Sequence, residues 1–264
     1  MEIAGYIAAA FIGLSLGLIG GGGSILTVPV MVYLFGLNPL LATSYSLFIV
    51  GSTSLVGAFR NYREGMVNLK TAVYFGAASI VTVFLTRKLL VPLIPEQLGT
   101  LAGFPITSSF LTMLLFAALM IVASVSMIKG SKVSEYEQEC PTCIRFFKLL
   151  GYGIAIGLVT GILGAGGGFL LIPALVLLVK LPMKKAIGTS LLIIALNSLI
   201  GFAGDLGHFT IDWSFLIIIT AIAISGIFIG SWLSGKLPAD KLKKGFGWFV
   251  LIMGVYIIWR EMIN

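Results

Sequence analysis

A glycine-rich cluster that occurs twice inside apolar sequence constrains this chain more than any other feature. Residues 20–29 read GGGGSILTVP, and residues 164–173 read GAGGGFLLIP, 144 positions further on. The same offset also aligns residues on both sides of the cluster, among them Gly17 with Gly161, Ala42 with Ala186, Ser46 with Ser190 and Ser54 with Ser198. A duplicated membrane segment, broken by glycine at the same place in each copy, indicates a binding site between two repeats.

The composition predicts a protein of the lipid bilayer. Hydrophobic residues make up 58% of the 264 residues, charged residues only 10%, and the mean hydropathy is +1.09. A soluble domain carries about a quarter of charged residues. We therefore expect a multi-pass protein of the plasma membrane; a homo-oligomer is compatible with this composition. The net charge of +7 comes from loop lysines and arginines and does not indicate a nucleic-acid partner.

The order of apolar segments predicts an all-α fold built from two repeats. Continuous apolar runs, rather than alternating ones, argue against strands. A polar stretch separates two homologous halves, which predicts a first membrane repeat at 1–128, a cytosolic linker at 129–148 and a second membrane repeat at 149–264. The apolar segments are 3–19, 25–36, 40–59, 69–86, 106–128, 149–163, 169–179, 186–203, 213–234 and 246–259.

Each glycine-broken unit leaves two architectures open. The second pieces, 25–36 and 169–179, are too short to cross the roughly 30 Å hydrocarbon core at 1.5 Å per residue. If each unit crosses the membrane once, each half has four crossings and the repeats are parallel. If each unit is instead a re-entrant helical hairpin, each half keeps three transmembrane helices and the second repeat is inverted.

The positive charges favour inverted repeats. In the re-entrant arrangement fourteen of the seventeen lysines and arginines lie on one side of the membrane, and only Arg87, Lys88 and Arg260 lie on the other. Positive loops face the cytoplasm, so both termini are expected outside. The loop containing Cys140 and Cys143 is then cytosolic, where thiols stay reduced. This C-x-x-C pair alone is weak evidence for a metal, because zinc needs two further ligands and His208 is the only histidine.

The glycine clusters predict a backbone site for an anion. Consecutive glycines interrupt a helix, and the new helix that follows directs unpaired N–H groups and its positive dipole end at the break. Close helix packing through small residues is the alternative explanation. Ser46 and Ser190, equivalent in the two repeats, are expected to donate to the same anion or to bond neighbouring helices. The predicted substrate-binding residues are Gly20, Gly21, Gly22, Gly23, Ser24, Ser46, Gly164, Gly166, Gly167, Gly168, Thr189, Ser190 and Asn197.

Charged side chains are expected to be almost absent from the membrane interior. Asp205, His208 and Asp212 lie at segment ends, where they are either solvated or able to relay a proton near the outer mouth. We expect no buried lysine or arginine at the site. No paired catalytic carboxylates, nucleophile–base pair or metal cluster occurs in the apolar segments, so we predict neither an enzyme nor a cofactor or bound metal.

The repeated motifs resemble those of the TauE/SafE sulfite exporter family, also called the toluenesulfonate uptake permease family. The resemblance covers nearly the whole chain. It rests on Gly20–Pro29 and Gly164–Pro173, on the polar helices that follow them, and on the segments 62–68 and 207–213. In the first copy Ser44-Tyr45 replaces Gly188-Thr189, and Asn68 replaces Asp212. The resemblance implies transport, often outward, of small sulfur-containing anions such as sulfite or organosulfonates.

These observations together predict a secondary transporter, an exporter, for a small sulfur oxyanion. A passive anion channel is the alternative of a different class, although such a pore would need a polar stripe on several helices. A permease for carboxylates or other small anions would share the architecture. A cation transporter is disfavoured because no Asp or Glu lies in the middle of an apolar segment.

Overall fold

Every apolar segment identified in the sequence forms a helix in the computed structural model. The structure describes residues 2–95, 97–101, 104–129, 143–164, 166–177, 179, 181–208, 210–234 and 239–263. The first half contains α1 (Glu2–Ile19), the 3-10 helix η1 (Gly21–Leu26), α2 (Thr27–Tyr33), α3 (Pro39–Arg63), α4 (Leu69–Leu85), the single π-turn η2 (Thr86–Leu90), α5 (Val91–Leu93) and α6 (Ser108–Lys129). The second half contains α7 (Cys143–Leu163), α8 (Gly168–Leu177), α9 (Met183–Asp205), α10 (Trp213–Ser234) and α11 (Ala239–Ile263).

Side-chain caps define the starts of three long helices. The Asn38 side chain accepts a hydrogen bond from the Leu40 N–H (3.0 Å) where α3 begins. Asn68 caps α4 through the Thr71 N–H (3.1 Å), and Asp212 caps α10 through the Phe215 N–H (3.1 Å). Asn68 and Asp212 are equivalent in the two repeats. The exchange of Asn for Asp therefore keeps one structural function, because both side chains are good N-caps.

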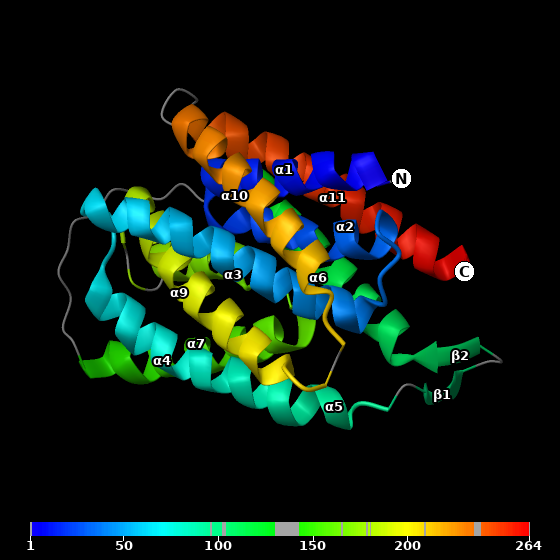
Figure 1. The fold of residues 1–264 in the computed structure, drawn as a ribbon. Helices are drawn as coiled ribbons and strands as arrows, with labels where there is room; N and C mark the ends of the chain where they lie inside the picture. Colours follow the sequence, from blue (N-terminus) through cyan, green and yellow to red (C-terminus); the bar gives the residue numbers. More distant parts are fainter. Residues whose placement is uncertain are drawn as a thin grey trace.

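The apolar segments are helical as expected, and one short pair of strands lies between two of them. Strands β1 (Gln97–Leu101) and β2 (Phe104–Thr107) pair antiparallel as a short hairpin between α5 and α6. The hairpin projects from one end of the helical bundle (Figure 1). The hairpin lies almost wholly between the apolar segments 69–86 and 106–128. The apolar runs from which the helices are predicted therefore do not predict it.

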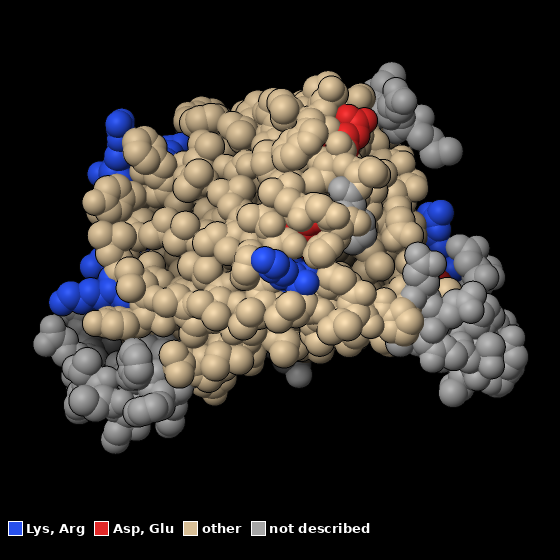
Figure 2. Space-filling view, turned by 60° about the horizontal axis from the view of Figure 1, so that its bottom comes forward, with Lys and Arg blue, Asp and Glu red and all other residues tan. Residues whose placement is uncertain are grey.

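Five of the described helices are long and apolar enough to cross a membrane. They correspond to α3, α4 with its extension to Leu93, α6, α9 and α10. The stretches Ala4–Ile19, Gly23–Tyr33 and Leu150–Leu163 are apolar but shorter. Large side chains such as Phe11, Trp232 and Trp259 are exposed on the outside of the bundle, where lipid would cover them. Figure 2 shows one face on which uncharged side chains cover most of the surface and basic side chains lie mainly at the margins.

Helices of the two halves pack against each other in an exchanged pattern. Helix α1 packs on α10, and its equivalent α7 packs on α4, which is the equivalent of α10. Helices α3 and α9 pack on each other, as do α6 and α11. The contact of α1 with α10 thus has an equivalent in the contact of α7 with α4, where each helix is replaced by its equivalent from the other half. The two halves therefore form one interlocked unit. The start of α1 and the end of α11 lie at the same end of the bundle (Figure 1).

The directions of these pairs follow from individual contacts. Gly57, late in α3, packs against Leu191, early in α9, and Leu47, early in α3, packs against Gly201, late in α9. These two equivalent helices are therefore antiparallel. Helices α6 and α11 are antiparallel as well, because Gly247 packs against Met127 and the later Gly254 against the earlier Met120.

Glycine allows the tightest of these interfaces. Helix α1 carries Gly13 and Gly17, helix α10 carries Gly226 and Gly230, and the two pairs face each other with their backbones in contact. A Cβ built on Gly17 would lie 2.5 Å from the carbonyl oxygen of Ile227. This G-x-x-x-G arrangement lets helices in a membrane approach closely enough for extensive van der Waals contact.

Replacing Gly230 by Val is expected to destabilise the fold by separating α1 from α10. A Cβ at this position would meet the Leu14 carbonyl oxygen and the Gly17 Cα, both of which belong to backbone that cannot move aside. Overpacking of this kind costs about 1–3 kcal/mol or more. Thermal unfolding of detergent-purified protein measures the effect. Gly151→Ala is the control, because Gly151 is exposed on α7 with nothing within 4 Å of its Cβ position; equal melting temperatures for the two variants would contradict the expectation.

Candidate functional site

The first glycine cluster turns the chain back into the bundle. After α1, Gly20 adopts a positive φ of 75°, and η1 leads directly into α2. Gly23 packs against Ser15 and Leu16, and near the other end of the hairpin the rings of Tyr6 and Phe35 are 6.0 Å apart. The chain therefore enters and leaves this unit at the same end, which is the path of a re-entrant hairpin.

The second cluster makes an equivalent turn with a different backbone. Gly164, Gly166 and Gly167 all have φ near 66°, in the left-handed region, and α8 begins at Gly168. The first cluster has a 3-10 helix followed by the seven-residue α2, whereas the second is followed directly by the ten-residue α8. The equivalence predicted for the two copies thus holds for the path of the chain but not for its local conformation.

The two turns meet in the interior of the bundle. A Cβ built on Gly21 would lie 2.5 Å from the Cα of Gly168, and both residues are buried. Only two residues without side chains can bring backbones this close. The two glycine breaks, predicted to face each other, are thus placed in direct contact. Gly22 also belongs to η1, and its burial lies outside what the structure describes.

Helices α3 and α9 each turn one face toward a glycine turn of the opposite half. Gly164 packs on Thr43, and Gly166 lies against Val50, with 2.8 Å from its Cβ position to the Val50 Cγ1. Ser46 lies three residues after Thr43 and four before Val50, so it belongs to the same helical face. On α9 the equivalent residues Ile187 and Ile194 pack on Gly20 and Gly21, which places Ser190 on the corresponding face.

Several buried hydroxyls around the turns have no hydrogen-bond partner. The Ser198 Oγ lies 2.9 Å from the Cβ position of Gly166, and the Thr160 Oγ1 lies beside Gly167. An unsatisfied buried hydroxyl costs about 1–3 kcal/mol, and these hydroxyls are chemically able to bond a polar ligand. The hydroxyls in this state include those of Thr27, Ser46, Ser54, Thr160 and Ser198, and the Oδ1 of Asn197 is also without a partner.

Other predicted site residues already have partners. The Ser190 hydroxyl donates to the Ile187 carbonyl (2.8 Å), so it differs from its equivalent Ser46. The Ser24 hydroxyl donates to the Gly21 carbonyl (2.8 Å). Thr189 accepts a hydrogen bond from the Asn68 backbone N–H (2.9 Å), and the Asn197 amide donates to Ser79 (2.7 Å). The bonds of Thr189 and Asn197 join α9 to the start and to the middle of α4, which is the interhelical role that the sequence left open.

The expectation that no arginine is buried at the site is wrong. Arg87, in η2, is fully buried, and its Nη1 donates to the Asp205 carboxylate (3.1 Å) and to the Thr43 hydroxyl (3.0 Å). Its Nη2 lies 2.6 Å from the Cβ position of Gly164. The sequence hid this residue because Arg87 and the exposed Lys88 stand together at the end of an apolar segment, as solvated loop cations do.

The three predicted proton-coupling residues do not form one group. Asp205 is fully buried in the ion pair with Arg87. His208 is exposed in the turn that follows α9. Asp212 is exposed and caps α10, while its backbone N–H donates to the Tyr45 hydroxyl (2.7 Å). Of the three, only Asp205 is buried inside the protein, and its partner Arg87 lies beside Gly164 of the second glycine turn.

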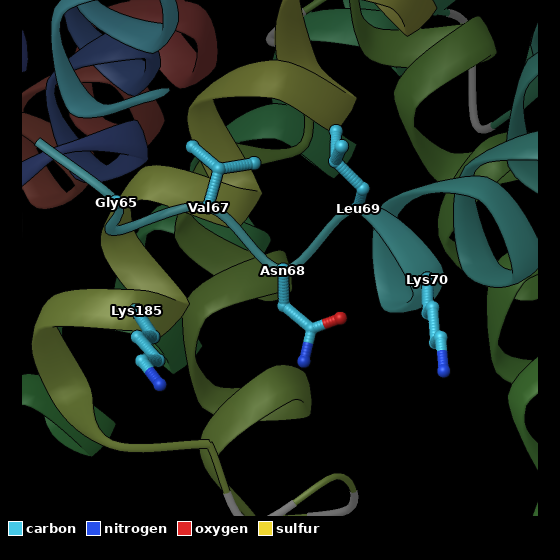
Figure 3. A pocket seen from close by; sticks show the side chains of 6 residues that line it. All are labelled: Gly65, Val67, Asn68, Leu69, Lys70 and Lys185. Carbon is cyan, nitrogen blue, oxygen red and sulfur yellow. The ribbon is translucent and has the colours of Figure 1, made fainter. Parts of the chain in front are cut away.

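A separate basic pocket lies where the α3–α4 loop meets the start of α9. It has a volume of about 320 Å³ and is lined by Gly65, Val67, Asn68, Leu69, Lys70 and Lys185. Figure 3 shows the Asn68 side chain between those of Lys185 and Lys70. In the part of the chain that the structure describes, no group of three or more His, Cys, Asp or Glu residues is placed to hold a metal ion. Cys140 and the rest of the segment 130–142 lie outside the described residues.

The long apolar helices define a polytopic α-helical membrane protein, and the comparisons with known proteins identify it as a membrane transporter. The sequence model of the sulfite exporter TauE/SafE family matches residues 6–257, so the chain belongs to this family. A "Probable membrane transporter protein" of Xylella fastidiosa (strain 9a5c) is 30% identical over 258 residues, covering 96% of this chain and 94% of that protein. No solved structure matches the chain significantly.

Two more distant relatives cover the chain equally well. The "Probable membrane transporter protein YdhB" of Bacillus subtilis (strain 168) is 26% identical over 249 residues, which are 94% of this chain and 96% of that protein. The "Probable membrane transporter protein MJ0441" of Methanocaldococcus jannaschii is 24% identical over 271 residues, with 96% and 93% covered. The whole chain, rather than one part of it, is therefore similar to membrane transporters.

Removing an unpartnered hydroxyl from the site is expected to stabilise the ligand-free protein or leave it unchanged. Ser198→Ala eliminates a buried group whose desolvation is not compensated, so the free energy of unfolding should rise by up to about 1 kcal/mol. Ser79→Ala is the matched control, because it removes the partner of the Asn197 amide and should lower stability by about 1–3 kcal/mol. Melting temperatures in detergent without added anion measure both; equal losses would show that Ser198 has a structural partner.

Proposed function

We propose that this transporter exports a small sulfur oxyanion, such as sulfite or an organosulfonate, which binds between the two glycine turns. The observation that carries the proposal is the contact of Gly21 with Gly168 amid buried hydroxyls that have no partner. The predicted site comprises the glycines of both turns together with Ser24, Ser46, Thr189, Ser190 and Asn197.

Three features support an anion as the ligand. The first turn of α8 leaves backbone N–H groups without intrahelical partners, and its positive dipole end lies at the second glycine turn. Hydroxyls such as those of Ser46 and Ser198 donate hydrogen bonds to an oxyanion without adding charge to the membrane interior. The buried carboxylate of Asp205 is paired with Arg87, so it is not free to bind a cation.

Inverted repeats offer a route for alternating access to this site. The equivalent helices α3 and α9 are antiparallel, which supports a pseudo-two-fold axis in the plane of the membrane. We propose that the repeats at 1–128 and 149–264 rock about the bound anion. With both termini outside, the linker 129–148 and most basic residues face the cytosol. The pocket between Lys70 and Lys185 then lies at the cytosolic side.

The family and the relatives support different parts of this proposal. The family's description as sulfite exporters favours a sulfur oxyanion and outward transport. The names of the relatives state only membrane transport. A passive channel or a permease for carboxylates would share the fold, and transport measurements with a panel of anions separate them from the proposed exporter.

The proposal is tested by combining ligand binding with a substitution in the second glycine turn. Sulfite at one hundred times its dissociation constant should stabilise the purified protein by about 2.7 kcal/mol, whereas carboxylates should not. Gly166→Val should abolish sulfite binding and transport in proteoliposomes, because its side chain would meet Val50 and Ser198.

Gly36→Val serves as the control for backbone strain. Gly36 has a similar positive φ of 69° but nothing within 4 Å of its Cβ position, and it lies in the loop after α2. This variant should lose stability yet retain transport. Normal transport by Gly166→Val would return the glycine turns to a purely packing role, and stabilisation by carboxylates alone would change the substrate class.

Membrane topology is tested by thiol labelling in intact cells. Cys140 and Cys143, the only cysteines of the chain, should react with membrane-permeant maleimide but not with an impermeant one. A variant that lacks both cysteines and carries His208→Cys should react with the impermeant reagent. His208 is exposed in the turn after α9, on the side of the membrane that the proposed topology places outside. Ready labelling of Cys140 and Cys143 from outside would reverse the proposed orientation.

A further inference from the structure

Three of the five N–H donors of the buried Arg87 are unused. Both of its hydrogen bonds, to Asp205 and to Thr43, come from Nη1. Its Nε and Nη2 are buried and have no partner. The Ser44 hydroxyl lies against the Asp205 carboxylate and bonds to it, so the carboxylate is held by Arg87 and by α3. Arginine is seldom fully buried unless it is paired, and buried donors without a partner call for an explanation.

The free donors lie together on one edge of the guanidinium. Because the group is planar, the Nε–H and one N–H of Nη2 point in parallel on the side away from Nη1. This edge matches two oxygens of a carboxylate, sulfonate or similar oxyanion and binds them with two parallel hydrogen bonds. The contacts that hold Arg87 in place therefore leave its bidentate edge available.

The free edge is next to the second glycine turn. The Nη2 lies 2.6 Å from the position that a Cβ of Gly164 would occupy, so a side chain there would fill the space beside the donors. Thr43, which accepts the other bond from Arg87, packs on the same glycine. The cation, the hydroxyls of α3 and the glycine turn thus come from three different elements and converge at one place.

We propose that the Nε–Nη2 edge of Arg87 is the cationic subsite for the transported oxyanion, and that Asp205 holds the guanidinium from the other side. This inference rests on the proposed function and adds the residue that selects for charge. The paired carboxylate keeps the empty site electrically neutral, and it weakens the attraction of the guanidinium for a second anion. Removing the carboxylate should therefore strengthen oxyanion binding.

The test measures sulfite affinity and sulfite-induced thermal stabilisation of detergent-purified protein for four variants. Arg87→Lys keeps the charge but loses the planar edge and should weaken sulfite binding by tenfold or more. The double variant Arg87→Gln/Asp205→Asn contains no unpaired charge, so it should fold, and it should lose sulfite binding almost completely. Asp205→Asn should melt at a lower temperature without anion, yet bind sulfite at least threefold more tightly than the natural protein.

Lys88→Gln is the matched control, because Lys88 is the neighbouring cation but is exposed over the Phe84 ring. It should leave sulfite affinity unchanged. Unaltered affinity in the double variant, or weaker sulfite binding by Asp205→Asn, would overturn the subsite and reduce the ion pair to a structural one.

The same panel separates this inference from the proposed function. If the natural protein binds sulfite and the double variant binds it equally well, the proposed function stands and the Arg87 subsite falls. If the natural protein binds no sulfur oxyanion, the proposed substrate class is wrong. Phosphate and acetate then decide the subsite, which stands if Asp205→Asn gains stabilisation by one of them and is overturned if it does not.

Discussion

Irregular backbone at membrane depth is the constraint on which the rest of this structure depends. Lipid offers no hydrogen bonds, so a broken helix is tolerated only inside protein or beside a polar cavity. This chain contains two such breaks, and the fold buries both by placing Gly21 against Gly168. The crossing helices that surround the breaks, α3 and α9 in particular, shield them from the bilayer and supply the polar side chains that face them.

The exchanged packing of the halves is a consequence of the same constraint. Neither glycine turn is enclosed by its own half alone, because the second turn packs on Thr43 and Val50 of α3 and the first on Ile187 and Ile194 of α9. The two halves must therefore interlock, and small residues at the α1–α10 and α4–α7 contacts let them do so closely. A site between the turns would be formed only by the whole chain.

The two halves nevertheless contribute unequally. Arg87 belongs to the first half, and the equivalent position of the second half is Ser231. Ser46 has an unpartnered hydroxyl, whereas that of Ser190 is bonded to its own helix. The glycine turns also differ, with three left-handed glycines described in the second and one in the first. A symmetric scaffold thus carries an asymmetric set of polar groups.

The sequence by itself determined the membrane class, the helical segments and the internal duplication, because these depend on local hydrophobicity and on spacing along the chain. It also located the glycine breaks, because consecutive glycines interrupt a helix by their own backbone preference, without any tertiary contact. Only the tertiary structure decided which polar residues are buried together: Arg87 and Asp205 are far apart in the sequence, and nothing local distinguishes Arg87 from the exposed Lys88. The β1–β2 hairpin and the difference between Ser46 and Ser190 were also hidden, because pairing and side-chain bonding depend on contacts that spacing alone does not encode.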